Sequence, residues 1–319
     1  MSEWLKKYRE NHADFDKGSL NAIGMDPFAA FSSWFDEAVN HGEAEANAFV
    51  LSTATAEEGV SSRIVYLKEL KDERFVFYTN YLSQKGQQIA AHSKVSMLFF
   101  WPGLQRQLRI EGIAEKIAEQ ESDAYFASRP RESQLGAWAS RQSETLEGAG
   151  DLIAAFEQYD QQFPNDVPRP PHWGGYAIQA TSIEFWQGRP SRLHDRIVFL
   201  GEVPAGEVHR WYQRCLLCVA CPRYEPFGLT PFEAAATECA LVCSRTGAFD
   251  QLAIPGLTGE MVDTGDAPGL AQAVLKVLSD REQALRMGQA ARQRVVEHFS
   301  LAKEAEGIGR VYAQLFAGA

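Results

Sequence analysis

The stretch RLHDRIVFLGEV, residues 192–203, joins two parts of the chain that differ in character. Its first half holds two arginines and a histidine, side chains that commonly bind phosphates. Its second half is an apolar run that ends in Gly-Glu-Val and predicts a β-strand. The composition changes at the same place, because all five cysteines lie after residue 214 and only one of the seven tryptophans lies after residue 186. We therefore expect two unrelated sequences to meet here.

The overall composition indicates a globular protein with room for two domains. The chain has 319 residues, of which 45% are hydrophobic and 23% charged, as in ordinary soluble proteins. No apolar run approaches the ~20 residues that span a bilayer, and the first residues lack the apolar segment of a secretory signal. A net charge of −11 argues against non-specific nucleic-acid binding. We expect a cytoplasmic protein without nucleic-acid or membrane partners.

The spacing Cys215-x2-Cys218-x2-Cys221 superficially resembles a metal-binding motif. The surrounding run CLLCVACP is apolar, however, and predicts a buried strand whose successive side chains alternate between two faces. Residues three apart then point in opposite directions and do not converge on one ion. We predict no metal site here, and reduced cysteines fit a cytosolic protein.

The first 203 residues predict a β-barrel with helices. Apolar residues at helical spacing over 27–41 indicate an amphipathic helix. Short alternating segments predict an antiparallel meander that closes into a barrel; they cover 48–55, 61–70, 74–81, 95–101 and 106–117. Helices are expected over 119–128, 132–140 and 151–163, with a break at Pro130. The segments 177–188 and 191–203 predict a hairpin.

From residue 204 the pattern changes to alternating helices and strands. Helical spacing over 207–215 and 230–239 alternates with apolar strands over 216–222, 240–244 and 259–264, before a helical tail over 268–316. This alternation is typical of a parallel α/β unit. The fold class that we expect is α+β, with domains at 1–203 and 204–319.

Six blocks of the first part resemble the pyridoxamine/pyridoxine 5'-phosphate oxidase family. They are SSRIVYLKEL (61–70), FVFYTNYLSQKG (75–86), LQRQLRIEG (104–112), YFASRPRESQLGAWASRQS (125–143), PHWGGY (171–176) and IEFWQGRPSRLHDR (183–196), in the family's order. The resemblance implies an FMN-binding split β-barrel that oxidises pyridoxamine or pyridoxine 5'-phosphate to pyridoxal 5'-phosphate with O2, giving H2O2. It also implies a homodimer with FMN at the interface.

The same resemblance assigns the site residues. FMN would be bound by Arg63, Ile64, Val65, Tyr66, Leu67, Lys68, Tyr78, Thr79, Gln84, Lys85, Gln107, Gln142, Ser143, Trp186 and Arg196. The substrate would be bound by Lys68, Tyr125, Arg129, Ser133, Arg192, Leu193 and His194, with Arg192 and His194 as the catalytic pair that positions the pyridine ring. Cations and hydroxyls suit the two phosphates, and glutamines suit ring edges. We expect Arg63, Gln107, Trp186 and Arg192 to line one common cavity.

Some of these positions raise further expectations. Gln84 stands where the family commonly has a basic residue, and His12 and Phe15 replace an Arg and a Tyr of the family's substrate lid. Arg63 and Lys68 are five residues apart, so they would face opposite ways on a flat strand. Either they touch different parts of the site, or the strand bends between them.

The part after residue 197 resembles the C-terminal half of a retaining glycosyltransferase with the GT-B fold, of the family-4 type. The resemblance rests on YEPFGLTPFEAAA (224–236), SRTGAFDQL (244–252) and GLTGEMVDTGD (256–266). It implies that Glu225 and Glu233 are vestigial sugar-nucleotide residues, since the acceptor-binding domain and the first strands of the donor domain are missing. We expect an incomplete, Rossmann-like and non-catalytic segment, and we expect residues 197–203 to serve the flavin barrel instead.

Two other functions stay open at this point. The chain would be a sugar-nucleotide-dependent glycosyltransferase if the second part were active. It would be a flavin-binding module without turnover if the altered end of the first part had abolished activity.

Overall fold

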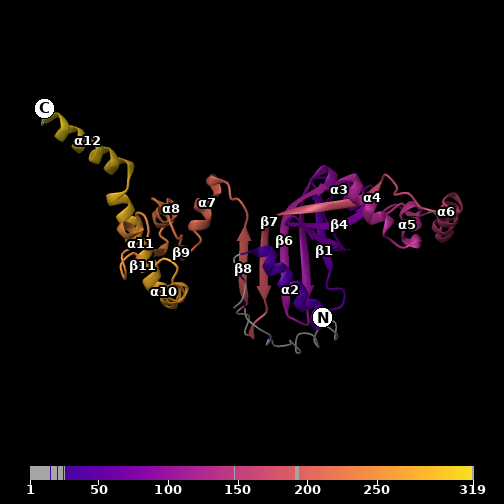
Figure 1. The fold of residues 1–319 in the computed structure, drawn as a ribbon, viewed down its shortest axis with the longest axis horizontal. Helices are drawn as coiled ribbons and strands as arrows, with labels where there is room; N and C mark the ends of the chain where they lie inside the picture. The colour runs from indigo at the N-terminus through magenta and orange to yellow at the C-terminus, as the bar shows by residue number, and fades with distance from the viewer. Residues whose placement is uncertain are drawn as a thin grey trace. The chain divides into compact units, whose positions relative to one another are not determined.

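A computed structural model of the protein describes residues 15, 20, 24, 26–146, 148–190 and 194–317. The chain divides into two compact units, up to residue 202 and from residue 203 onward. Figure 1 shows a mixed α and β unit in the indigo to salmon part of the chain and a second α/β unit in the orange to yellow part. Each unit is described by itself below.

An eight-stranded antiparallel sheet forms the first unit. Its path is β2-β1-β5-β6-β7-β4-β3, and β8 also pairs with β7. The strands are β1 (Ala48–Thr55), β2 (Gly59–Tyr66), β3 (Glu69–Lys71), β4 (Arg74–Asn80), β5 (Lys94–Trp101), β6 (Arg106–Lys116), β7 (Trp173–Gln187) and β8 (Asp195–Leu200). The helices are α2 (Pro27–His41), α3 (Gln84–Ala91), α4 (Glu119–Ala127), α5 (Arg131–Ala139) and α6 (Ala149–Gln162).

Residues at each end of helix α2 set its bounds. The Asp26 side chain accepts hydrogen bonds from the backbone N–H groups of Phe28 and Ala29, and Pro27 occupies the first turn. Gly42 ends the helix with φ 83°, a left-handed conformation that glycine adopts without steric cost. The observed bounds match the predicted helix over residues 27–41.

The strand order differs from the predicted meander. Strand β5 pairs with β1, whereas β3 and β4 lie at the far end of the path, where β4 pairs with β7. The meander prediction was wrong because β7 is long enough to hold two neighbours along one edge: β4 beside residues 173–179 and β8 beside residues 182–187. A bulge in the β6–β7 register, at Glu111/Gly112, separates these two parts.

Two local predictions also need correction. The single strand predicted over 61–70 is broken into β2 and β3. Residues 84–91 form helix α3, which was not predicted because its sequence, QKGQQIAA, carries few apolar residues. The cap was the available signal: the Ser83 side chain accepts a hydrogen bond from the backbone N–H of Gly86.

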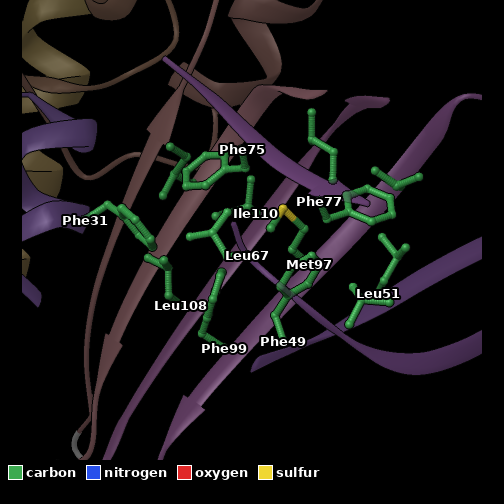
Figure 2. Close-up of a cluster of buried hydrophobic side chains, with 14 of the residues drawn as sticks. Phe31, Phe49, Leu51, Leu67, Phe75, Phe77, Met97, Phe99, Leu108 and Ile110 are labelled. Carbon is green, nitrogen blue, oxygen red and sulfur yellow. The ribbon is translucent and has the colours of Figure 1, made fainter. Parts of the chain in front are cut away.

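The core of the first unit is built from aromatic and aliphatic side chains that face inward from alternating strand positions. Figure 2 shows Phe31 of α2 pointing toward side chains from several strands, including Phe75 and Phe99. The rings of Phe31 and Phe75 meet edge to face at 5.0 Å. Each such ring contributes roughly 1.5–3 kcal/mol by leaving water. The helix is thereby fixed against the sheet.

The strand predicted directly after RLHDR belongs to the sheet of the first unit, as expected. Strand β8 pairs antiparallel with β7, with Phe199 opposite Ile183 and Arg196 opposite Trp186. Phe199 packs against Phe185 of the core, while alternate residues of β8 are exposed. The prediction that residues 197–203 contribute a strand to the first unit is confirmed for 197–200.

A three-stranded parallel sheet with the order β11-β10-β9 forms the second unit. Its elements are α7 (Ala205–Tyr212), β9 (Leu217–Ala220), α8 (Thr230–Ala236), β10 (Ala240–Ser244), α9 (Phe249–Leu252), β11 (Gly259–Val262), α10 (Ala267–Ser279), α11 (Arg281–His298) and α12 (Leu301–Ala317). All of β10 is buried, as expected for a central parallel strand. The predicted parallel α/β unit is confirmed.

The described residues have neither a membrane-spanning helix nor a cluster of metal ligands. None of their helices is long and apolar enough to cross a membrane. They include no group of three or more His, Cys, Asp or Glu side chains placed to hold a metal ion. Cys218 is buried within β9, but the neighbouring Val219 is 47% exposed, so the strand predicted here exists and is only half-buried.

Substitution of Gly112 by alanine should destabilise the first unit. A Cβ at this position would overlap the carbonyl oxygen of Gln179 on β7, so the β6–β7 bulge must shift. We expect a cost of about 1–3 kcal/mol, and a fall in melting temperature of about 2–4 °C per kcal/mol. Tryptophan fluorescence reports on this unit, since only Trp211 lies in the other.

Gly150→Ala is the matched control. Gly150 lies in α6 with open space around its Cα, so alanine there should not lower the melting temperature. Equal melting temperatures for Gly112→Ala and wild type would show that the bulge tolerates a side chain.

Candidate functional site

A cavity of about 730 Å3 opens in the first unit. Its walls come from β2, β4, the start of α3, α5 and the segment that follows α5. Of the residues predicted to bind FMN or substrate, it is lined by Arg63, Ile64, Val65, Tyr66, Lys68, Tyr78, Thr79, Gln84, Lys85, Arg129, Ser133, Gln142 and Ser143. The structure therefore brings most of the predicted site residues together.

Arg63 and Lys68 both line the cavity, on either side of the end of β2. Strand β2 ends at Tyr66, and the backbone N–H of Lys68 then bonds to the carbonyl of Val76 on β4. Exposure alternates along this segment: Lys68 is exposed, as is Tyr66, whereas Arg63 is half-buried. This alternation favours the first of the two alternatives that the sequence left open, in which the two cations touch different parts of the site.

One corner of the cavity holds two cations without a nearby carboxylate. Arg63 donates to the Thr53 hydroxyl at 2.6 Å and to the Leu51 carbonyl at 3.2 Å. Lys85 Nζ lies 3.0 Å from Gln142 Oε1. Among the described residues, no Asp or Glu lies within ion-pair distance of either cation. The neutral partners orient the two side chains but leave their charge for an anion.

Burial lowers the pKa of both cations in this corner. Desolvation, together with the nearby Arg63 charge, lowers the pKa of Lys85 to about 8. Burial also lowers the pKa of Arg63. A bound anion would oppose both effects, so anion binding and protonation of Lys85 should favour each other.

The start of α3 adds backbone donors to the same corner. Ser83 caps the helix, and the backbone N–H of Gln84 donates to Ser143 Oγ at 3.2 Å. Ser143 has φ 73°, a left-handed conformation that is uncommon for a residue with a side chain. The segment after α5 is thus folded back over the positive end of α3.

A stack of aromatic side chains forms another wall of the cavity, and Arg129 packs against it. Tyr78 stacks on Tyr125 at 3.8 Å and on Trp173 at 5.5 Å, and the Arg129 guanidinium lies 4.5 Å from the Trp173 ring. Arg129 Nη1 is buried without a hydrogen-bond partner among the described residues. A buried guanidinium N–H without a partner is costly, which indicates a place for an external acceptor. Burial raises the pKa of Tyr78 to about 12, so its hydroxyl stays protonated at neutral pH.

A second group of predicted residues forms one row across three strands. Gln107 on β6 lies opposite Trp186 on β7, which lies opposite Arg196 on β8. Directly opposite residues share a face of the sheet, so the three side chains are neighbours. The His194 ring lies 4.6 Å from Trp186, and its Nδ1 accepts a hydrogen bond from the backbone N–H of Arg189.

The two groups lie apart within one chain. None of Gln107, Trp186, His194 and Arg196 lines the cavity. On β7, Gly175, the partner of Tyr78, and Trp186 are eleven residues apart, a path of roughly 36 Å at strand spacing. The expectation of one common cavity is therefore not met by a single chain. Arg192, Leu193 and His12 lie outside the described residues.

Comparison with known proteins gives matches for both parts. A family model described as "Pyridoxamine 5'-phosphate oxidase" matches residues 35–163. A pyridoxine/pyridoxamine 5'-phosphate oxidase of Cupriavidus necator is 50% identical over 184 residues, which are 57% of this chain and 87% of the relative. The chain belongs to the pyridoxamine 5'-phosphate oxidase family. Another oxidase of that name, from Rubrobacter xylanophilus, is 51% identical over 56% of this chain and 83% of its own.

A solved structure shares the fold of the first part of the chain. The crystal structure of PhzG from Burkholderia lata, in complex with tetrahydrophenazine-1-carboxylic acid, superposes with a TM-score of 0.54 at 26% identity. It covers 58% of this chain and 95% of PhzG. Residues 191–294 separately match a family model described as "Glycosyl transferases group 1". This second match begins inside the block that resembles the oxidase.

The oxidase site differs in detail from the predicted residue set. Leu67 does not line the cavity, because its side chain is buried in the core. Tyr125 reaches the site through its stack on Tyr78. Sequence reasoning missed Asn80 and Trp173, which both line the cavity. Trp173 could have been found, since it lies within the block PHWGGY.

Phe15 adds an aromatic contact to the second group. Its ring meets Trp186 edge to face at 5.8 Å and His194 at 5.2 Å. The sequence singled out this position for its departure from the family's lid. The structure places it beside the His194 ring.

The two glutamates of the second unit do not share a cavity. Glu233 is exposed in the first turn of α8 and lines a groove of about 360 Å3 between α7 and α8. Glu225 does not line that groove; it is half-buried in a loop, and its backbone N–H donates to Thr246 Oγ1 at 3.2 Å.

Sulfate should stabilise the first unit through the Arg63–Lys85 corner, and the effect should depend on pH. The charge of sulfate is constant between about pH 7 and pH 9.5, whereas Lys85, whose pKa is about 8, loses its proton over this range. We expect a larger rise in melting temperature at about pH 7 than at about pH 9.5. Binding is thus strong below the pKa of Lys85 and weakens as the pH rises through it.

Lys85→Met is the comparison variant. It retains the general salting effect of sulfate but should lose the part that depends on pH. The interpretation fails if sulfate raises the melting temperature of both proteins by the same amount at each pH.

Proposed function

We propose that this protein is an FMN-dependent oxidase that converts pyridoxamine or pyridoxine 5'-phosphate into pyridoxal 5'-phosphate, with O2 as electron acceptor and H2O2 as product. One observation carries the proposal: the cavity offers two separate positions for anions. One is the Arg63–Lys85 corner, and the other is the unpartnered Nη1 of Arg129. A phosphorylated flavin and a phosphorylated pyridine together supply two such anions.

The residues present fit FMN. Arg63 and Lys85 would neutralise its phosphate, and the start of α3 with Ser143 would add hydrogen bonds. Gln142 holds Lys85 in place from the other side. When bound, the flavin would supply the redox chemistry: the substrate would lose two electrons and two protons in total, and O2 would gain both to become H2O2. The amine substrate additionally consumes water and releases ammonia.

The substrate phosphate is assigned to the aromatic wall. Arg129 Nη1 would gain the acceptor that it lacks, with Ser133 and Lys68 as further donors in the same cavity. Tyr125 would act from its position on Tyr78. These side chains bind and orient the substrate, and no covalent nucleophile takes part.

The catalytic pair is assigned to Arg192 and His194. Because His194 Nδ1 accepts a hydrogen bond from the Arg189 backbone, a neutral His194 ring carries its proton on Nε2. Nε2 can then donate to the C4' substituent of the substrate. Arg192 and Leu193 would contact the pyridine ring, as the family resemblance implies.

The separation of the two residue groups supports the proposal of a homodimer. One chain holds the cavity, and its Gln107–Trp186–Arg196 row is too distant to reach the same ligand. A second copy would bring its own row to the cavity of the first. Exposed apolar side chains fit such an interface: Ile64 and Tyr66 beside the cavity, and Val198 and Leu200 on β8.

We assign no catalysis to the second domain, residues 204–319. Its sheet has three strands, and Glu225 and Glu233 do not face one cavity. Transfer or hydrolysis of a nucleotide sugar that is lost in Glu225→Ala would contradict this assignment. FMN binding without oxygen uptake would instead indicate a flavin-binding module.

The reaction is tested by oxygen uptake with FMN and pyridoxine 5'-phosphate. Wild type should consume O2, and Arg129→Met should raise KM by roughly 10–100-fold, because a charge-assisted hydrogen bond to phosphate is lost. FMN affinity should stay within about twofold, since Arg129 is assigned to the substrate.

Arg131→Met is the matched control. Arg131 lies two residues away but bonds to Asp160 at 2.6 Å and to the Phe163 carbonyl at 2.5 Å, and it does not line the cavity. Its removal should leave KM unchanged. No oxygen uptake by wild type loaded with FMN would refute the proposed reaction.

The shared site is tested by mixing two variants that each bind FMN weakly, at an FMN concentration that fills wild type but neither variant. Lys85→Met impairs the cavity, and Arg196→Met impairs the row. A mixed dimer then carries both defects in one site and none in the other. Coexpression at equal levels should restore about a quarter of wild-type activity, since half of the dimers are mixed and each has one intact site.

A second mixture controls for general rescue. Lys85→Met with Arg63→Met places both defects in the same group, so every site of every dimer stays impaired. If this mixture recovered activity, or if the first mixture recovered none, a site shared between two copies would be wrong.

A further inference from the structure

A buried carboxylate lies beside the Gln107–Trp186–Arg196 row. Glu184 is on β7, two residues before Trp186, so both side chains leave the strand on the same face. The Glu184 side chain is only 11% exposed. Glutamate is rarely so buried unless cations pair with it, because a desolvated carboxylate is costly.

Glu184 bridges two arginines from different strands. Its Oε2 accepts a hydrogen bond from Arg109 Nη2 at 3.1 Å, and its Oε1 lies 3.4 Å from Arg196 Nε. Arg109 lies opposite Glu184 on β6, and Arg196 lies on β8, so one carboxylate connects three strands. Arg109 has a second anion, Glu111, at 3.9 Å. Within the described ranges, Arg196 is paired with Glu184 alone.

The contact restrains a side chain that would otherwise be free to move. Arg196 is 58% exposed and lies on β8, which pairs with β7 alone in the described part of the chain. A long exposed side chain loses rotamer entropy when it binds a ligand. Because Glu184 engages Nε, the two terminal amino groups of the guanidinium stay available. An arginine held in this way loses less entropy on binding.

We propose that Glu184 is a positioning residue: it holds Arg196 by Nε so that the two terminal amino groups are presented to FMN. The inference rests on the proposed function, in which Arg196 contacts FMN. Glu184 itself acts through Arg196 and does not touch the cofactor.

The proposal predicts that Glu184→Gln weakens FMN binding, whereas a simple charge effect would strengthen it. FMN is an anion, so removal of a nearby negative charge would by itself strengthen binding. Loss of the contact that orients Arg196 weakens binding instead. The direction of the change in Glu184→Gln therefore distinguishes the two effects.

The experiment is a double-variant cycle on the full-length apoprotein, with FMN affinity measured by quenching of flavin fluorescence. Glu184→Gln should raise the Kd about tenfold, the value of a charge-assisted contact, and Arg196→Met should raise it at least as much. Adding Glu184→Gln to Arg196→Met should change the Kd by less than about twofold, because Glu184 acts through Arg196.

Glu111→Gln is the matched control. It removes an equal charge from the exposed side of Arg109, where the Glu111 side chain is 60% exposed, and leaves Arg196 untouched. Its Kd should stay within about twofold of wild type. Melting of each apoprotein verifies that the variants fold. If Glu184→Gln does not fold, Glu184→Asp replaces it in the same cycle, with a smaller rise in Kd that again disappears beside Arg196→Met.

Two results would overturn the inference. One is an unchanged or lower Kd in Glu184→Gln. The other is a Kd in the double variant that multiplies the two single effects, since that shows independent action. A wild-type protein that binds no FMN would refute the proposed function itself, whereas the two results above leave it standing.

Discussion

Strand β7 is hydrogen-bonded to β6 along one edge, and along the other edge to β4 near its start and to β8 near its end. This register places Tyr78 beside one end of the strand and Arg196 beside the other. A strand extends about 3.3 Å per residue, so the two groups of candidate site residues are held apart within one chain. Each chain therefore has the cavity at one end of β7 and the Gln107–Trp186–Arg196 row at the other.

The cations of the cavity and the cation of the Gln107–Trp186–Arg196 row have different partners. In the cavity, Arg63, Lys85 and Arg129 have neutral partners or unfilled hydrogen bonds, which leaves positive charge for phosphates. In the row, Glu184 already neutralises Arg196. Unpaired buried cations reduce the stability of the ligand-free protein, as is common for binding sites. Arg196 lies exposed on β8, so the contact with Glu184 that orients its side chain favours ligand binding more than an unneutralised charge would.

Residues 195–200 lie where the sequence resembles both families, so they could in principle form a strand in either unit. Residues 195–200 pair with β7 in the first unit, although the family match of the glycosyltransferase type begins at residue 191. The second unit keeps a parallel sheet of three strands, with β10 wholly buried between β9 and β11. Inward-facing Ile197 and Phe199 of β8 complete the first core, since Phe199 packs against Phe185. These residues belong to the first unit, and the three-stranded sheet of the second unit is built without them.

Local patterns in the sequence determined most elements of this protein: the capped helix α2, the alternating strands, the buried β10 and the change of class after residue 203. Most lining residues of the cavity could be named in advance only because six blocks of the sequence resemble a known oxidase family. Patterns within a segment depend on neighbours a few residues away, and those are printed in the sequence. Only the tertiary structure decided the order of the strands, the ion pair between Glu184 and Arg196, and the distance between the two groups. These features depend on contacts between residues far apart in the chain, for which a single sequence carries no local signal.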